Sequence, residues 1–256
     1  MRLWFIIFLV FTASLCFGNK DDNVYLLTVP KSGTHCLEKY FKLLEHIDKK
    51  PPFPIRRSHV SESDLKLPKN YFTKTNVKKI ILIRDPRDVF ISIVKWLESR
   101  EHYLRSYVTF NPSWKKLSLS EKVLQAVDYE KIPDGFNWKC KDRFLPQQVN
   151  KTIQKAIALS KLPNTLVVRY EDLSGGHGVR AQFETMRKIN DFVGVTLHQS
   201  EYDFLIENLY GNKLIRSWTF REGKVYKWRK IMDESLQQKI WGLYGEAILD
   251  MGYDKY

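Results

Sequence analysis

The segment TVPKSGTH, residues 28 to 35, places one lysine, hydroxyl side chains and a glycine where an apolar run meets an amphipathic stretch. A strand that feeds a helix through a tight turn presents free backbone N–H groups and the positive end of the helix dipole to an anion. In such a turn Gly33 allows close backbone approach, Ser32 and Thr34 add hydroxyl donors, and Lys31 adds a full charge. The segment therefore predicts a cradle for a phosphate-like anion.

Two familiar chemistries fit this loop poorly. The nucleoside triphosphatase loop, GxxxxGK[ST], has a glycine directly before its lysine, whereas Pro30 precedes Lys31 here, so ATP hydrolysis is disfavoured. The pair His35-Cys36 resembles a phosphatase nucleophile, but residues 37 to 42 replace the glycine and arginine that should follow. A phosphatase is disfavoured as well.

Strand-like and helical runs alternate along the chain, which is typical of an α/β fold with parallel strands. We expect strands at 24–28, 79–83 and 165–169. The expected helices follow residue 35, begin near Pro86 with Asp85 as the cap, follow the Ser118 to Glu121 capping box, follow the Gly175-Gly176 turn, and begin near Asp233. The last helix should bury Leu236, Ile240, Leu243, Ala247 and Met251. Parallel sheets bind ligands at the carboxyl ends of their strands, where the informative loops lie.

The N-terminus carries a separate signal. An apolar run from Leu3 to Phe17 follows Arg2, and we interpret residues 1–18 as a signal peptide, with a short membrane anchor as the alternative. The expected location is the secretory pathway or another extracytoplasmic compartment. Residues 19–256 are expected to form a single domain, in which the aromatic-rich segment 100–146 is an insertion on the acceptor side.

Composition narrows the class of partner. The chain has 256 residues and a formal charge of +13, which favours anionic partners. The three cysteines, Cys16, Cys36 and Cys140, have neither metal-ligand spacing nor the number that a disulfide framework needs, so we expect no metal site.

Four separated motifs, in order from residue 24 to about 252, carry a resemblance to a known family. The order Pro-Lys-Ser-Gly-Thr after a first strand resembles the 5′-phosphosulfate loop of sulfotransferases that use 3′-phosphoadenosine 5′-phosphosulfate (PAPS), and His35 follows within that loop. The stretch ILIRDPRDVFISIVKW is similar to the family's 3′-phosphate motif, because Arg84 ends a strand and Ser92 follows eight residues later. An arginine suits this task since its planar fork can hold two phosphate oxygens.

Two further motifs complete the resemblance. VVRYEDL resembles the family's Tyr-Glu-Asp-Leu segment and puts Tyr170 on the adenine side. FREGKVYKW resembles the family's Arg-Lys-Gly loop, in which Arg221 and Gly223 match and Lys224 follows. Glu222 stands where lysine is usual, and Tyr226 and Lys227 replace glycine and aspartate.

A further departure concerns the adenine. Cys36 occupies the position of an adenine-stacking tryptophan in the small-molecule branch, so Tyr210 is the candidate for that contact.

The resemblance also implies catalytic roles. The family carries its base in a Lys-x-His segment before the second motif strand, and Arg57-Ser58-His59 takes that place here. Histidine suits proton removal at neutral pH. His59 is thus the expected base, with His35 as the competitor, while Lys31 stabilises the charge on the departing phosphate.

The implied protein is a PAPS-dependent sulfotransferase on a P-loop-like, three-layer α/β fold with a central parallel sheet flanked by helices, closest in motif pattern to the branch with hydroxyl acceptors. It would transfer a sulfuryl group to a hydroxyl or amine of a small molecule, lipid or glycan, without a metal and without a nucleic-acid partner. Membrane association through the N-terminus is part of the expectation. The alternative is a secreted binding module that keeps the fold and holds an anionic polysaccharide or a nucleotide without turnover.

Overall fold

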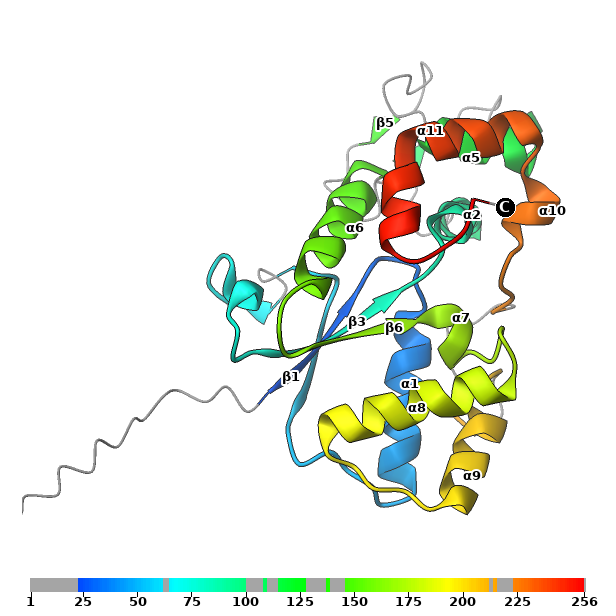
Figure 1. The fold of residues 1–256 in the computed structure, drawn as a ribbon. Coiled ribbons are helices and arrows are strands. Elements are labelled where there is room, and N and C mark those ends of the chain that lie inside the picture. Colours follow the sequence, from blue (N-terminus) through cyan, green and yellow to red (C-terminus); the bar gives the residue numbers. More distant parts are fainter. Residues whose placement is uncertain are drawn as a thin grey trace, which may run out of the picture.

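The computed structural model describes residues 23–61, 65–99, 108–109, 115–127, 137–138, 146–211, 214–215 and 223–255. In this part of the chain a sheet of four parallel strands lies between two layers of helices, as Figure 1 shows. The expected three-layer α/β architecture is confirmed.

The strand order places a crevice at the carboxyl ends of the central strands. The strands β1 (Val24–Thr28), β2 (Ile55–Ser58), β3 (Lys78–Ile83) and β6 (Thr165–Arg169) are arranged as β2-β1-β3-β6. The chain therefore moves to one side of β1 and then returns to the other, which opens a crevice at the carboxyl ends of β1 and β3. Strand β2 was not expected from the sequence, because the exposed Arg56 and Arg57 interrupt any apolar run.

Two hydrophobic cores hold the layers together. Val24 and Leu26 of β1 enter one core, and Tyr25 and Leu27 enter the other. The first core lies under α1 (Thr34–His46), α8 (Val179–Val193) and α9 (Gln199–Leu209), and the second under α2 (Pro86–Ser99), α6 (Pro146–Ser160) and α11 (Glu234–Asp250) (Figure 1). A strand buried on both faces has to be apolar throughout, which explains the uninterrupted run in β1.

Shorter elements complete the described structure: η2 (Tyr71–Thr73), β4 (Val108–Thr109), α5 (Leu119–Val127), β5 (Asn137–Trp138), α7 (Tyr170–Leu173) and α10 (Trp228–Ile231). Strands β4 and β5 pair antiparallel. The capping box before α5 is confirmed, because the Ser118 N–H donates to Glu121 Oε2 at 2.7 Å and the Glu121 N–H donates to Ser118 Oγ at 3.2 Å.

Several expectations fall outside the described residues. These are the signal peptide or anchor at 1–18 and most of the acceptor-side insertion at 100–146, with its aromatic residues Tyr103, Tyr107, Phe110, Trp114, Phe136 and Phe144. Within the described ranges no helix has the length and apolar character to span a bilayer, and no three His, Cys, Asp or Glu side chains gather as metal ligands would.

The expected burial of the last helix needs one correction. The helix α11 begins next to Asp233, as predicted, and Asp233 caps it by accepting the Leu236 N–H at 2.8 Å. Leu243, however, is 56% exposed, and Tyr244 is buried in its place with its ring centroid 5.0 Å from that of Phe90. Both residues are apolar neighbours in sequence, so the apolar pattern alone did not show which of them faces the core.

The turn between β1 and α1 requires a glycine, which has no side chain, at position 33. Gly33 has φ of 100° and ψ of 30°, and a Cβ atom built on it would lie 2.2 Å from Cδ2 of Tyr170. Gly33 thus serves two needs, a left-handed backbone and close contact with an aromatic ring from the β6 end. The loops after β1 and β6 are packed directly on each other.

We predict that Gly33→Ala destabilises the protein by more than left-handed strain alone. Gly194 is the matched control, because it has φ of 74° and ψ of 35° while a Cβ there would meet Pro52 only at an ordinary 3.6 Å. Gly194→Ala should lower the free energy of unfolding by about 1 kcal/mol, and Gly33→Ala by roughly 1–3 kcal/mol more because of overpacking. Urea denaturation measures both, and equal losses would contradict the contact with Tyr170.

Candidate active site

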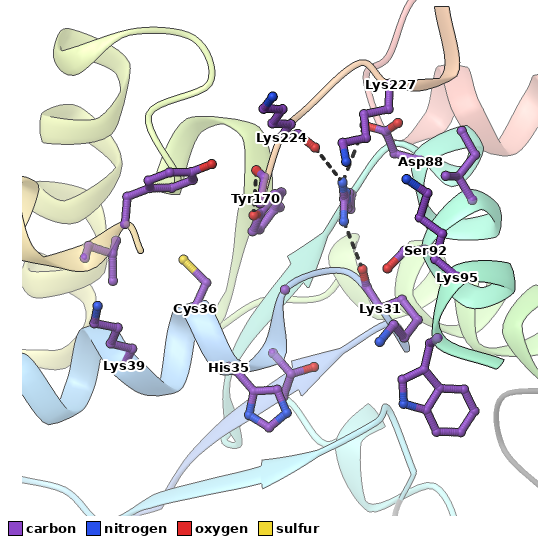
Figure 2. A pocket seen from close by; sticks show the side chains of 18 of the residues that line it. Lys31, His35, Cys36, Lys39, Asp88, Ser92, Lys95, Tyr170, Lys224 and Lys227 are labelled. Atoms are coloured by element: carbon purple, nitrogen blue, oxygen red, sulfur yellow. Dashed lines mark hydrogen bonds and ion pairs between the residues drawn. The ribbon is translucent and has the colours of Figure 1, made fainter. Parts of the chain in front are cut away.

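A cavity of about 280 Å³ opens at the carboxyl ends of the four parallel strands. Figure 2 shows side chains of α1, α2 and several loops converging on it. The lining contains most of the residues singled out in the sequence: Lys31, Gly33, Thr34 and His35 after β1, His59 after β2, Arg84 and Ser92 after β3, Tyr170 after β6, and Gly223 and Lys224 before α10. Residues as far apart as Lys31 and Lys227, 196 positions along the chain, thus share one cavity, and the predicted motifs meet there.

One of the predicted residues that the structure describes is not part of this lining. Ser32 is fully buried, and its hydroxyl donates to Val29 O at 2.7 Å and to Leu82 O at 3.1 Å. The hydroxyl therefore ties the loop to β3 and does not face the cavity. Arg221 lies outside the described residues.

Arg84 connects three segments that line the cavity. Its Nη1 donates to Lys31 O at 3.4 Å, its Nη2 donates to Lys224 O at 3.0 Å, and Nη2 also lies 3.6 Å from Asp88 Oδ2. The guanidinium stands 4.7 Å from the ring centroid of Tyr170. Nε of Arg84 is buried and has no hydrogen-bond partner among the described residues, so one donor of this side chain is unsatisfied.

Tyr170 joins the β6 end to the segment before α10. Its hydroxyl donates to Gly223 O at 2.9 Å, while its ring covers Gly33. Burial raises the pKa of this phenol, so the hydroxyl stays protonated and remains a donor. The adenine-side role expected for Tyr170 stays a prediction. In the structure this side chain holds two of the cavity walls together.

Asp88 of α2 anchors the segment before α10. Its Oδ2 accepts the Tyr226 N–H at 2.7 Å and its Oδ1 accepts the Trp228 N–H at 3.1 Å. The carboxyl is 1% exposed, and burial raises its pKa against the opposing charge of Arg84. The sequence marked Asp88 only by its place in the first turn of α2, so this role was not predicted.

A second set of contacts fixes the same segment from outside. Tyr226 has φ of 57°, its hydroxyl bonds to Nε2 of His177, and Nδ1 of His177 lies 2.5 Å from Asp172 Oδ1. A left-handed tyrosine is strained and persists only where its surroundings fix it. The position of residues 223–228 is therefore determined from both sides.

His59 is oriented by the first strand. Its Nδ1 lies 3.1 Å from Thr28 Oγ1 and 3.4 Å from Thr28 O, and Thr28 Oγ1 in turn lies 2.8 Å from Thr34 Oγ1. A carbonyl oxygen can only accept, which favours the tautomer with its proton on Nδ1. A neutral imidazole in this tautomer carries its lone pair on Nε2. When the ring is neutral, these contacts therefore favour the form whose Nε2 can accept a proton.

His35 has a different environment. Its side chain is 48% exposed, and its Nδ1 lies 2.8 Å from Glu38 Oε2. Glu38 also pairs with Arg57. Burial by itself would raise the pKa of Glu38, but the hydrogen bond from His35 and the neighbouring positive charges outweigh it and lower the pKa. His35 is therefore held by a carboxylate at the edge of the cavity.

Cys36 and Tyr210 face the same cavity. Burial raises the pKa of the Cys36 thiol to about 12, so this side chain is protonated at neutral pH and does not suit nucleophilic catalysis. Lys39 of α1 donates to Gly211 O at 2.8 Å, which fixes the chain next to Tyr210 at the end of α9. The protonated thiol of Cys36 argues further against a phosphatase.

The sulfotransferase domain family matches residues 48–252 of the chain. The chain belongs to this family. Human sulfotransferase 2A1 is 25% identical over 214 residues, which cover 74% of this chain and 65% of the relative. Rat sulfotransferase 2A6 is 27% identical over 214 residues, which cover 73% of this chain and 65% of the relative. The match thus spans 65% of the length of these relatives, and the loop at 28–35 precedes the family match.

Two solved structures share the fold. Mouse sulfotransferase SULT7A1 complexed with PAP aligns with a TM-score of 0.58 at 17% identity, over 89% of this chain and 84% of the other. Retinol dehydratase in complex with androsterone and the inactive cofactor PAP aligns with a TM-score of 0.57 at 17% identity, over 92% and 83%. The predicted α/β fold of a sulfotransferase is therefore confirmed.

We predict that Cys36 resists alkylation in the folded protein. With a thiol pKa of about 12, the thiolate fraction at pH 8 is orders of magnitude below that of a free cysteine. Iodoacetamide at pH 8 should modify Cys36 at least roughly 100-fold more slowly than in urea-unfolded protein. Peptide mass spectrometry measures the site-specific rates, and equal rates in both states would contradict the shift.

Proposed function

We propose that this chain transfers a sulfuryl group from PAPS to a hydroxyl group of a small-molecule acceptor. The observation that carries the proposal is that an anion-binding turn, a buried arginine and an oriented histidine share one cavity in a chain of the sulfotransferase domain family. PAP in two solved relatives of the same fold supports the choice of donor.

The residues present fit a nucleotide with two anionic ends. The buried Arg84 Nε has a hydrogen to donate and no acceptor among the described residues, which fits a phosphate oxygen. Ser92 and Lys224 lie in the same lining and would assist Arg84, while Lys31 and the N-terminus of α1 would hold the opposite, 5′ end. When bound, PAPS supplies the sulfuryl group and a phosphate as its leaving group.

The protein's own groups would move one proton and stabilise one charge. Nε2 of His59 takes the proton of the acceptor hydroxyl, and the hydrogen bonds of Thr28 to Nδ1 hold the imidazole in the correct form. Lys31 and the N–H groups at the start of α1 stabilise the negative charge that develops on the leaving phosphate. These roles require only cationic and neutral side chains of the lining.

The proposed acceptor is a small molecule with an apolar body. Ile91 and Trp96 provide apolar surface in a lining that also contains His59, and androsterone is bound in the solved retinol dehydratase. A lipid or glycan hydroxyl is less favoured, because neither observation points to one. The secreted binding module without turnover remains a distinct outcome of the experiment that follows.

We predict that His59→Ala lowers turnover about 10² to 10⁴-fold, the usual contribution of a positioned proton acceptor. The affinity for adenosine 3′,5′-bisphosphate should be nearly unchanged, because His59 acts on the acceptor. The assay incubates PAPS with a mixed library of hydroxyl compounds and detects products that have gained SO₃ by mass spectrometry. Calorimetry gives the nucleotide affinity.

His35→Ala is the matched control, because it removes a histidine of the same cavity that is held by Glu38. It should retain most of the turnover. If His35→Ala abolished transfer while His59→Ala remained active, the assignment of the base would be wrong. Nucleotide binding without transfer to any acceptor class would support the binding module.

We also propose that the chain enters the secretory pathway and that its signal peptide is removed. The apolar run from Leu3 to Phe17 supports this, and the first strand begins only at Val24. N-terminal sequencing of the native protein should then find a start near Asn19. An intact Met1 in a membrane fraction would support the short anchor instead.

A further inference from the structure

Two lysines from different elements meet on one side of the cavity. Lys95 lies on α2, one helical turn after Ser92, and Lys227 directly precedes α10. Both line the cavity. Figure 2 shows Lys95 and Lys227 in the same region of the cavity as Asp88 and Ser92. Neither lysine was predicted from the sequence to have a role in binding.

The charge around this pair is unbalanced. Among the described residues that line the cavity, seven are Lys or Arg and one, Asp88, carries a carboxylate. Arg84 lies 3.6 Å from Asp88 and thereby takes up part of that negative charge. Asp88 also accepts two backbone N–H groups, so both of its carboxylate oxygens already accept hydrogen bonds from the segment before α10.

The lysines are close enough to affect each other. Burial, then the charge of Lys95, and then that of Arg84 lower the pKa of Lys227. Cations that gather in this way repel one another unless an anion lies between them. A phosphate dianion there would offset the repulsion and favour the charged form of Lys227.

We propose that Lys95 and Lys227 form a clamp for the 3′-phosphate of the donor and so determine selectivity for 3′-phosphorylated nucleotides. The inference rests on the proposed function, in which Arg84 and Ser92 face that phosphate. Lys95 lies three residues after Ser92, so both side chains share a face of α2. Lys227 reaches the same side of the cavity from the segment before α10. Two ammonium groups from different elements can each donate to the same phosphate.

The test compares the affinities for three nucleotides by calorimetry. Adenosine 3′,5′-bisphosphate carries the phosphate in question, adenosine 5′-monophosphate lacks it, and adenosine 2′,5′-bisphosphate has the same charge at the neighbouring carbon. Lys95→Met and Lys227→Met should each weaken binding of the 3′,5′-bisphosphate by roughly tenfold, as expected for a charge-assisted contact. Binding of the 5′-monophosphate should change by less than about twofold, since it does not reach the clamp.

Lys230→Met is the matched control. Lys230 lies on α10, carries the same charge, and is exposed outside the cavity lining. It should change none of the three affinities by more than about twofold. Lys95→Arg and Lys227→Arg keep the charge and should retain binding of the 3′,5′-bisphosphate to within roughly threefold. Circular dichroism establishes that each variant is folded.

The outcomes separate this inference from the proposed function. If the native chain prefers the 3′,5′-bisphosphate and both methionine variants keep that preference, the clamp is wrong and the proposed function stands. An equal loss for all three nucleotides would also overturn the clamp, because it would indicate a general charge effect. If the native chain bound none of the nucleotides, both proposals would fail.

Discussion

The guanidinium of Arg84 is the contact on which the cavity depends. It donates to a carbonyl of the first loop and to a carbonyl of the segment before α10, and it faces both the ring of Tyr170 and the carboxylate of Asp88. A single buried cation thus holds together loops that come from distant parts of the sequence. Burial makes such contacts strong, and it also makes an unused donor costly. The same residue that assembles the walls therefore favours an anion inside them.

The surrounding contacts give each wall a fixed position. Asp88 and the Tyr226–His177–Asp172 chain hold the segment before α10, and Ser32 ties the first loop to β3. His59 takes its orientation from Thr28 of the central strand. Preorganised donors and a preorganised base are what in-line transfer between two bound substrates requires. The sheet contributes to this order, because the residues after β1, β2, β3 and β6 all follow the carboxyl ends of its parallel strands.

Much of this site was predictable from the sequence. Lys31 and Gly33 were recognisable because they follow a predicted strand in a turn that suits an anion, whereas Arg84 and His59 were singled out by the resemblance to the family's motifs. Other features required the structure. The hydroxyl of Ser32 donates to backbone carbonyls, and Tyr244 is buried where Leu243 was expected to be. These outcomes depend on contacts between distant segments, which local patterns do not record.

The roles of Lys95, Lys227 and Asp88 were also missed, although one signal was present. Lys95 lies three residues after Ser92, which puts both on one face of α2. Lys227 could be placed only once the segment before α10 had been positioned against that helix. A single charged residue outside a regular helix forms no sequence pattern, so its partners can be identified only from the tertiary structure.

The most direct test of the site is a crystal structure with adenosine 3′,5′-bisphosphate. We expect the nucleotide in the cavity between the first loop and α2, with a phosphate oxygen within hydrogen-bonding distance of Arg84 Nε. That donor would then gain the acceptor that the described residues do not provide. A nucleotide bound elsewhere, or one bound in the cavity with no oxygen near Arg84 Nε, would contradict the assignment of Arg84 as the centre of the donor site.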